Sequence, residues 1–368
     1  MGGLNPVLVV GASGVIGAAT VEKFVKEGWD VIAMSRRRPV LPADIMFEHV
    51  AVDLTDGDAC AAAVSAMKPI SHLVYCAVAE APGLFSGWTD PEMIALNKRM
   101  FANLAEPLAA CGNLAWVGLL QGTKAYGAHL HPMEMPARED RPRDPHANFY
   151  WEQEDIVRAL AARHGFAWTI FRPQIVFGGA PGAVMNPVIA LGAYAAICKA
   201  RGLPLAYPST HGFMWELTDA ALLADAHHWA ATTPAAARQI YNVTNGDVFV
   251  LRDAWPHVAA AYRMETGEPR DLSLAKFFAE AESIAAWDEL VARHGLVAHS
   301  LDALVNQSHH YVDMLLDRRI IEAGGLPQMV SAIKIRKAGF TECCDSLDSL
   351  LFWLRRMVET RLLPPDLI

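Results

Sequence analysis

The sequence has few cysteines and no arrangement of them that would hold a metal or a disulfide framework. The six cysteines stand at positions 60, 76, 111, 198, 343 and 344 and form no CxxC pair. The histidine pairs His227-His228 and His309-His310 lack a third ligand at metal spacing and are expected to face solvent or to cap helices. We therefore predict neither a metal site nor disulfide bonds.

Long hydrophobic runs are also missing. The apolar stretch from Pro187 to Cys198 is interrupted by glycine and tyrosine, and it is shorter than the roughly 20 residues that a helix needs to span a bilayer. No basic-then-apolar leader precedes the first expected strand, whose Leu8-Val9-Val10 already leads into a glycine-rich turn. The sequence thus predicts a protein without a membrane span that is located in the cytoplasm.

Positive charge is in deficit as well. Lysine and arginine number 31 against 40 aspartates and glutamates, and the formal net charge at pH 7 is −9. This balance disfavours general binding to nucleic acid, because the phosphate backbone would repel the chain. Hydrophobic residues make up 53% of the sequence, enough to bury a large core. Any local basic cluster in so acidic a chain therefore becomes informative.

The N-terminal segment has the pattern of a dinucleotide-binding unit. A short apolar strand over residues 7–10 is followed by a turn with glycines at 11, 14 and 17, and then by an amphipathic helix over residues 18–27. Such glycines allow a tight turn, a close approach of the backbone to a pyrophosphate and a close contact of helix and strand. The start of the helix offers N–H groups to phosphate. The residues expected at the cofactor phosphates are Gly11, Ser13, Gly14, Val15, Ile16 and Gly17.

The next predicted strand, Asp30 to Met34, leads into Ser35 and three consecutive arginines. A protein specific for NAD would carry an acid near this point to bind the ribose 2′-hydroxyl, but residues 31–43 contain none. An acid would repel a 2′-phosphate, whereas guanidinium groups can bind one bidentately. The alternative is a solvated basic loop. We predict NADPH as the cofactor, with Ser35, Arg36 and Arg37 near its 2′-phosphate.

Three further apolar segments are predicted to be strands, at residues 49–54, 72–77 and 114–120. Asp53, with Leu54 beside it, ends the first and can accept a hydrogen bond from the adenine amino group. Ala77 ends the second, and we expect it near the cofactor ribose. The third leads to Lys124 at the carboxyl edge of the sheet, where doubly wound folds bind ligands.

These elements predict an α/β fold. A Rossmann-type doubly wound parallel sheet over residues 1–175 would bind the cofactor, with later segments returning to the sheet. Residues 176–368 would form a smaller, mainly helical substrate-capping region, because helical periodicity dominates beyond residue 250. The apolar helices at the C-terminus are compatible with a lid over the substrate or with a homodimer surface.

The predicted helix from Tyr150 to His164 carries a tyrosine without its usual partner. In short-chain dehydrogenases, a lysine four residues after the catalytic tyrosine lies on the same helix face and lowers the tyrosine pKa. Position 154 here is glutamate, and no tyrosine in the chain has a lysine at this spacing. Lys124 is expected to approach Tyr150 from its own segment, and its ammonium would favour the phenolate. By spacing alone, a surface lysine and a tyrosine near a helix start are the alternative.

Ordered segments along residues 5–366 resemble the progesterone 5β-reductase and iridoid synthase family, an atypical branch of the extended short-chain dehydrogenases. The similar segments are residues 11–17, 35–37, 97–104, 122–126, 148–155, 171–178, 194–199 and 242–249. The resemblance implies that Tyr150 and Lys124 are the catalytic pair. By the same analogy Ile175 lies beside the nicotinamide carboxamide and Met185 near the pyrophosphate, although ordinary core packing would also explain both.

The resemblance also implies a reaction. Family members reduce activated carbon–carbon double bonds by adding hydride from NADPH to the β-carbon of an enone or enal. Tyr150 would bind the enolate oxygen like one donor of an oxyanion hole, with Lys124 polarising the phenol, and the α-carbon proton could come from solvent. The expected substrate is a small, apolar α,β-unsaturated carbonyl compound. Trp151 stands where many relatives have a second tyrosine, and His129 lies in the segment where they have the sequence Gly-Pro-Phe. We therefore expect the shape of the substrate to differ from that of the relatives' substrates.

Three other functions compete with this interpretation. A carbonyl reductase would use the same tyrosine while adding hydride to the carbonyl carbon. A nucleotide-sugar epimerase would be expected to keep the tyrosine–lysine helix pair and an acid for NAD, and both are absent. A non-catalytic NADP-sensing protein would commonly lose the tyrosine, which this chain retains.

Overall fold

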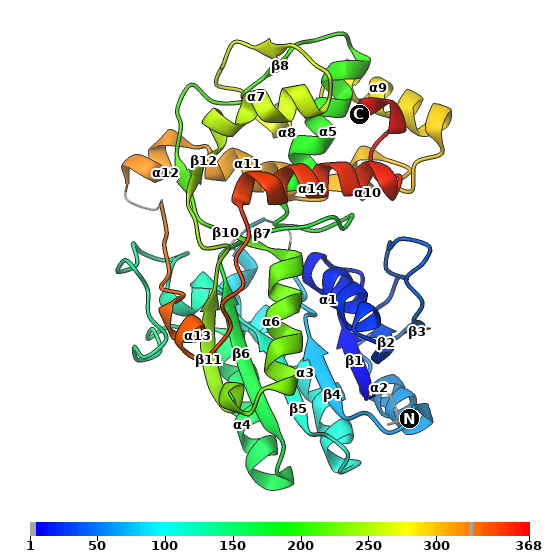
Figure 1. Cartoon of the computed structure of the whole chain (residues 1–368), viewed down its shortest axis with the longest axis vertical. Helices are drawn as coiled ribbons and strands as arrows, with labels where there is room; N and C mark the ends of the chain where they lie inside the picture. Colours follow the sequence, from blue (N-terminus) through cyan, green and yellow to red (C-terminus); the bar gives the residue numbers. More distant parts are fainter. Residues whose placement is uncertain (1–4, 82, 85, 324–326) are drawn as a thin grey trace. The chain divides into compact units, whose positions relative to one another are not determined.

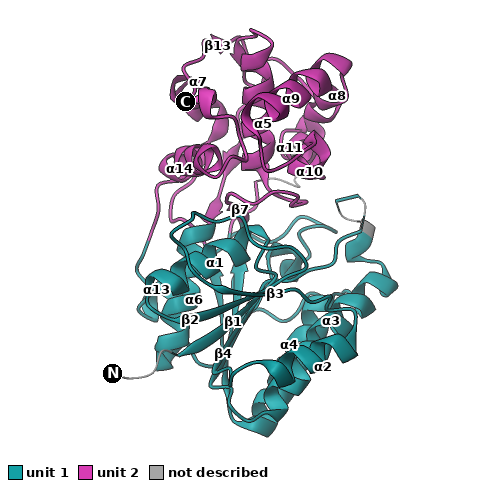
Figure 2. Ribbon diagram, turned by 90° about the vertical axis from the view of Figure 1, so that its right-hand side faces the viewer, with its two compact units in different colours: residues 1–174, 220–243, 330–342 teal, residues 175–219, 244–329, 343–368 magenta. Residues whose placement is uncertain are grey.

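The structure is a computed structural model that describes residues 5–81, 83–84, 86–323 and 327–368. It divides into two compact units, coloured separately in Figure 2. The first unit comprises the residues up to Gln174 together with 220–243 and 330–342, and the second comprises 175–219, 244–329 and 343–368. The chain therefore leaves the first unit and returns to it twice. The predicted roles of the two parts, cofactor binding and substrate capping, stay predictions.

A seven-stranded sheet forms the centre of the first unit, in the order β11-β6-β5-β4-β1-β2-β3 (Figure 1). All neighbouring strands run parallel. The strands are β1 (Pro6–Val10), β2 (Asp30–Met34), β3 (Glu48–Val50), β4 (His72–Tyr75), β5 (Trp116–Leu120), β6 (Ala167–Pro173) and β11 (Gln239–Val243). The order reverses between β1 and β4, which is where doubly wound sheets bind ligands at the carboxyl edge. The predicted Rossmann-type sheet is confirmed.

The central strands are largely apolar because helices cover both faces of the sheet. Val7 to Val10 are all fully buried. On one side α1 packs against α6, and α2, α3 and α4 pack together in a second group (Figure 2). The helices are α1 (Val15–Lys26), α2 (Gly57–Ala66), α3 (Pro91–Ala110), α4 (Phe149–His164), α6 (Ala220–Thr232) and α13 (Ile333–Lys337), with single turns η1 (Ser86–Trp88), η2 (Thr123–Tyr126) and η3 (Pro234–Ala236).

Two expectations about the first unit need correction. The predicted strand 49–54 ends already at Val50, so Asp53 lies in the loop after β3. His227 is expected to face solvent, but its imidazole is fully buried. The reason is that helix α6, which carries it, packs against α1. Its Nδ1 lies 3.2 Å from Thr20 Oγ1, and burial lowers the pKa of His227 to about 3. The ring is therefore neutral at neutral pH.

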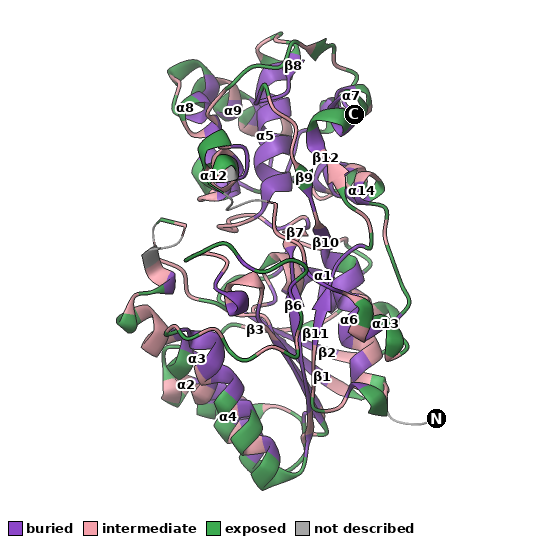
Figure 3. Ribbon diagram, turned by 90° about the vertical axis from the view of Figure 1, so that its left-hand side faces the viewer, coloured by how far each residue is buried: buried purple, intermediate pink, exposed green. Residues whose placement is uncertain are grey.

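The second unit is mainly helical, as predicted, and is built around α5 (Pro187–Ala200). This helix is apolar on all sides, so every residue from Pro187 to Cys198 is buried (Figure 3). Around it lie α7 (Leu251–Ala261), α8 (Leu274–Phe278), α9 (Ala281–His294), α10 (Leu301–Val305), α11 (Ser308–Leu315), α12 (Arg318–Glu322), α14 (Ser346–Glu359) and η4 (Pro365–Leu367). Among the described residues, no helix is both long enough and apolar enough to cross a membrane.

Short strand pairs complete the second unit. They are β7 (Ile175–Phe177) with β10 (Leu217–Asp219), β8 (Leu205–Ala206) with β13 (Thr266–Gly267), and β9 (Met214–Trp215) with β12 (Phe249–Val250). Asp219, at the end of β10, is 4% exposed and accepts hydrogen bonds from Ser349 Oγ and, at 3.0 Å, from Trp353 Nε1. This buried carboxylate ties β10 to α14.

Candidate active site

The three glycines of the first turn have different neighbours. Gly11 has φ of +76°, and a Cβ there would lie 2.6 Å from the backbone nitrogen of Ala77 in the segment after β4. A Cβ on Gly17 would lie 2.2 Å from the carbonyl oxygen of Gly11, which is closer than atoms can approach. Gly14 is exposed and would meet only the Gly11 oxygen, at 3.3 Å. The backbone contacts thus require Gly11 and Gly17, whereas the exposed Gly14 has only one neighbour for a Cβ, and its role at a pyrophosphate stays a prediction.

The start of α1 is suited to an anion. Gly14 is the N-cap and supplies no side-chain cap, and the first turn contains no acid. The N–H groups of Val15, Ile16 and Gly17 precede the first helical hydrogen bond, from Ala18 to Gly14, so they can donate to phosphate. The side chains of Ser13, Val15 and Ile16 are only partly buried. The residues present therefore fit the phosphates of a dinucleotide.

The basic segment after β2 carries three arginines in a row. All three arginines are exposed, and the Arg38 guanidinium lies 4.5 Å from the centroid of the Phe47 ring. Ser35 is buried and donates a hydrogen bond to the Arg37 carbonyl oxygen at 2.6 Å, which shapes this turn. The role of Arg36 and Arg37 at a 2′-phosphate stays a prediction.

The remaining predicted cofactor contacts lie in both units. Asp53 is exposed, and hydrogen bonds from Thr55, with a smaller effect of Arg36, lower the pKa of its carboxyl group. Leu54 belongs to the hydrophobic core, and Ala77 is half-buried beside Gly11. The other two residues, Ile175 at the start of β7 and Met185 before α5, are partly buried residues of the second unit, and their role in cofactor binding stays a prediction.

Tyr150 and Lys124 meet at a tryptophan that the sequence does not single out. The Tyr150 side chain is 8% exposed, and a Cβ on Gly122 would lie 3.3 Å from its hydroxyl oxygen, which places the hydroxyl beside the backbone that leads to Lys124. Lys124 Nζ lies 4.0 Å from the centroid of the Trp88 ring. The Trp88 and Tyr150 rings are 5.3 Å apart, edge to face. The predicted pair thus comes from η2 and α4 and contacts one aromatic ring.

Burial changes the acid–base behaviour of both groups. It lowers the pKa of Lys124 to about 8, although the negative charge of Glu80 acts in the opposite direction. It also raises the pKa of Tyr150 above its ordinary value, with Glu80 adding to the rise and Arg172 opposing it. The expected lowering of the Tyr150 pKa is therefore wrong, because burial raises this pKa more than the charge of Arg172 lowers it. Tyr150 stays protonated and can donate a hydrogen bond.

Glu80 is a third ionisable group at this place, and sequence reasoning missed it. It follows β4 in a loop whose backbone is held by Asn97, which accepts from Ala79 N at 2.8 Å and donates to Ala79 O at 2.9 Å. Burial raises the pKa of Glu80, and Lys124 opposes this. The available signal was its position three residues beyond Ala77, at the same carboxyl edge of the sheet.

The two departures from the family pattern lie on the same side of α4. Trp151 is buried and donates from Nε1 to the His146 carbonyl oxygen at 3.1 Å. The His129 ring lies 5.1 Å from the His146 ring and 6.3 Å from Trp88. Burial, and to a smaller degree Lys124, lower the pKa of His129 to about 4, so this ring is neutral. Both residues therefore contact His146.

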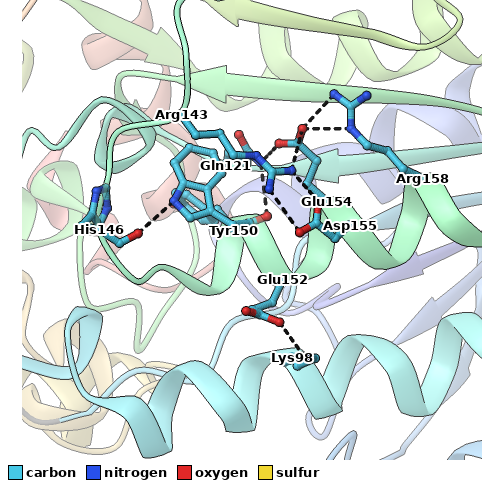
Figure 4. Close-up of polar contacts among 10 residues, drawn as sticks. Lys98, Gln121, Arg143, His146, Tyr150, Glu152, Glu154, Asp155 and Arg158 are labelled. Carbon is cyan, nitrogen blue, oxygen red and sulfur yellow. Dashed lines mark hydrogen bonds and ion pairs between the residues drawn. The ribbon is translucent and has the colours of Figure 1, made fainter.

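Glu154, which stands where the partner lysine would be, holds α4 to the end of β5 (Figure 4). Gln121 donates from Nε2 to Glu154 Oε2 at 3.0 Å and to the Tyr150 carbonyl oxygen at 3.4 Å. Arg158 Nε donates to Glu154 Oε1 at 2.9 Å, and Arg143 lies 3.1 Å from the same oxygen. The carboxylate is 3% exposed. It therefore fixes the helix that carries Tyr150 to the strand that leads to Lys124.

The Glu154→Gln variant is expected to lose about 1–3 kcal/mol of unfolding free energy, because buried donors lose a charged acceptor. Burial alone would raise the pKa of Glu154, but hydrogen bonds from Gln121 and Arg143 and the arginine charges lower it overall. The Glu154 carboxylate therefore stabilises the folded chain at pH values above about 4.3, the pKa of a glutamate in the unfolded chain. This contribution disappears as the pH falls through the lower pKa that Glu154 has in the folded chain. Denaturant unfolding at neutral and at acidic pH should show the difference from wild type shrink in acid.

Glu152→Gln is the matched control for that experiment. Glu152 lies on the same helix but is 41% exposed and pairs with Lys98, at 2.5 Å. Exposed ion pairs contribute little, so this variant should unfold almost like the wild type. Equal losses in the two variants would contradict a special role of Glu154.

The family comparisons agree with this architecture. Residues 7–244 match the model of the NAD dependent epimerase/dehydratase family. The (S)-8-oxocitronellyl enol synthase of Antirrhinum majus is 33% identical over 80% of this chain and 78% of its own length. The 3-oxo-Delta(4,5)-steroid 5-beta-reductase of Arabidopsis thaliana is 27% identical over 97% of this chain and 92% of its own length. The similarity therefore extends well beyond the glycine turn.

Solved structures show the same fold at lower identity. The UDP-glucose 4-epimerase of Bifidobacterium longum, in complex with NAD+ and UDP, covers 99% of this chain and all of its own chain with a TM-score of 0.64 and 14% identity. The UDP-glucose 4-epimerase of Thermus thermophilus, complexed with NAD, covers 74% of this chain and 92% of its own with a TM-score of 0.53 and 22% identity. The chain belongs to the NAD dependent epimerase/dehydratase family, in the branch of extended short-chain oxidoreductases that includes these enol synthases and steroid reductases.

Proposed function

We propose that the protein is an NADPH-dependent reductase of activated carbon–carbon double bonds in small, apolar enones and enals. The observation that carries this proposal is the buried, protonated Tyr150 hydroxyl beside Gly122, with the Lys124 ammonium on the neighbouring Trp88 ring. The name of the Arabidopsis relative describes a steroid with an oxo group next to a double bond, which supports the same substrate chemistry. The expected cytoplasmic location and homodimer stay predictions.

The cofactor would bind along the first unit, with its pyrophosphate at Gly14 and the start of α1. Arg36 and Arg37, both exposed, would bind the 2′-phosphate and thereby favour NADPH over NADH. When bound, NADPH supplies the hydride that reaches the β-carbon of the substrate. The glycine turn and the arginines would position the cofactor and neutralise its phosphates, and they take no part in the hydride transfer.

Tyr150 would act on the substrate oxygen. As a hydride adds to the β-carbon, an electron pair moves through the former double bond and negative charge develops on the carbonyl oxygen. A protonated phenol can donate a hydrogen bond to that oxygen, and the interaction strengthens as the charge grows. Because Tyr150 is buried, water screens this interaction little. The α-carbon then takes its proton from solvent.

Lys124 would add positive charge at the same place. With a pKa of about 8, it is mostly protonated at neutral pH. Its ammonium lies on the Trp88 ring that also contacts Tyr150, so its field favours negative charge on an oxygen bound at the tyrosine. The lysine would thus stabilise the enolate through space and through the phenol.

The proposal is tested by product identity. The purified chain is incubated with NADPH and a panel of enones, enals and matching saturated aldehydes, and the products are identified by mass and NMR. Saturated ketones or aldehydes from the unsaturated substrates are expected. Allylic alcohols would instead assign a carbonyl reductase, since the same hydroxyl can serve hydride addition to the carbonyl carbon. Tight NADPH binding without any turnover would favour the non-catalytic sensor.

A further inference from the structure

No single helix sets the distance between Tyr150 and Lys124. When both groups lie four residues apart on one helix, the helix itself fixes their spacing. Here Lys124 lies in η2, a single turn of four residues, and Tyr150 lies in the first turn of α4. Helix ends fray and short turns have few hydrogen bonds of their own. A link between the two segments is therefore needed if their geometry is to be reproducible.

One amide side chain makes this link. Asn148 is 2% exposed and accepts a hydrogen bond from Tyr150 N at 3.0 Å through Oδ1. Its Nδ2 donates to the Lys124 carbonyl oxygen at 3.3 Å and contacts His146 Nε2 at 3.1 Å. Since a backbone N–H must face the amide oxygen and a carbonyl must face the amide nitrogen, the orientation of the amide is determined by its partners. Asn148 therefore joins the backbone of both segments directly.

A carboxylate and an imidazole orient that amide. His146 Nδ1 lies 2.7 Å from Asp144 Oδ1, and the carboxylate can only accept, so Nδ1 carries the proton. In the neutral imidazole Nε2 is then an acceptor, which is what the Asn148 Nδ2 group requires. The second oxygen of Asp144 lies 2.9 Å from His131 Nε2. The His146 carbonyl oxygen also accepts a hydrogen bond from Trp151 Nε1, so His146 is held through both its ring and its backbone.

We propose that Asp144, His146 and Asn148 form a positioning relay that holds the Lys124 segment against the start of α4 and thereby sets kcat. None of the three needs to touch the substrate, so they are positioning residues. The inference rests on the proposed function, in which Tyr150 and Lys124 act on one substrate oxygen. A misplacement of about 1 Å at such a pair can lower a rate by up to about 10²-fold.

Asn148 is also the N-cap of α4, and the experiment must separate the cap from the relay. Serine caps helices about as well as asparagine, whereas alanine does not. Serine cannot, however, donate to both the Lys124 carbonyl oxygen and His146. If Asn148 is only a cap, Asn148→Ser will behave like the wild type and Asn148→Ala will lose thermal stability.

The relay predicts a different result for the serine variant. Asn148→Ser should lose less thermal stability than Asn148→Ala, because it keeps the cap, yet it should lose about tenfold or more in kcat for enone reduction. The KM for NADPH should change little, because the glycine turn and the arginines are untouched. His146→Gln, whose side-chain oxygen can accept from Asn148, should retain more activity than His146→Phe. The double variant Asn148→Ser/His146→Phe should be no slower than its slower single variant, because both changes break one chain of contacts.

Hydrogen exchange tests the link without any reaction. Gly127 N donates to the Lys124 carbonyl oxygen at 3.2 Å, so its exchange reports on the segment that Asn148 holds. In the full chain, Asn148→Ser should speed exchange in a peptide covering residues 121–128 and leave α4 protected. Wild-type exchange there, or wild-type kcat in the serine variant, would overturn the relay. A wild-type chain that reduces no enone would overturn the proposed function and the catalytic part of the relay, and exchange would still decide the physical link.

Discussion

Replacing Tyr150 by phenylalanine should lower kcat for enone reduction by about 10²–10³-fold, the usual effect of losing one donor to a developing oxyanion. The change removes only the hydroxyl. The ring keeps its contacts with Trp88 and Phe149, whose centroids lie 5.3 Å and 4.8 Å from it. Folding and NADPH affinity should therefore stay close to those of the wild type. Steady-state kinetics of the purified variant, with its melting temperature measured in parallel, would give the answer.

Tyr75→Phe is the control for this experiment. Tyr75 ends β4 in the same unit and is 1% exposed, and its hydroxyl has no hydrogen-bond partner among the described residues. Removing that hydroxyl should leave kcat unchanged. A Tyr150→Phe enzyme as fast as Tyr75→Phe would show that the substrate oxygen is not bound by Tyr150, and the mechanism would have to be abandoned.

The cofactor end of the fold could be predicted because its constraints are local. Gly17 is required by its backbone contact with Gly11, six residues before it, and this contact leaves a fixed spacing in the sequence. Gly11 also contacts the backbone after β4, which the sequence alone does not show. The arginines directly follow β2, and their role at a 2′-phosphate stays a prediction. Lys124 could be selected because every parallel strand ends at the same edge of the sheet, so a residue just after β5 must lie near that edge.

The surroundings of the pair could not be predicted in this way. Trp88 and Glu80 lie in the loop between β4 and α3, and no periodicity says which loop side chains turn toward Lys124. From the sequence, Glu154 is notable only because it occupies the position where a lysine is usual. Its partners Gln121 and Arg143 come from other segments, so its role is not visible there. Its role depends on tertiary contacts between residues far apart in the chain.

The acid–base behaviour of Tyr150 shows the limit of reasoning from neighbours alone. The proximity of a positive charge predicts a lowered pKa for Tyr150, and this argument considers only Tyr150 and Lys124. Burial depends on everything around them, and here it prevails and raises the pKa of Tyr150. The protonated phenol is the form that the expected role as a hydrogen-bond donor requires. His227 makes the same point, since its burial follows from the packing of α6 against α1.

Removing both guanidinium groups in Arg36→Ala/Arg37→Ala should weaken NADPH binding by about 10²-fold or more. Each charge-assisted hydrogen bond contributes about 1.5–3 kcal/mol, and about 1.4 kcal/mol corresponds to a factor of ten. NADH has no 2′-phosphate, so its affinity should change little and the cofactor preference should disappear. Dissociation constants for both cofactors, measured by fluorescence titration, would check this.

Arg38→Ala is the matched control, because the Arg38 guanidinium lies over Phe47 at 4.5 Å and is not expected to reach the phosphate. Salt provides a second check, since exposed charges are screened within about 10 Å at 0.1 M ionic strength. Added salt should weaken NADPH binding by the wild type far more than binding by the double variant. If instead the double variant loses NADPH and NADH equally, the arginines serve the fold of the turn after β2, and the 2′-phosphate must be bound elsewhere.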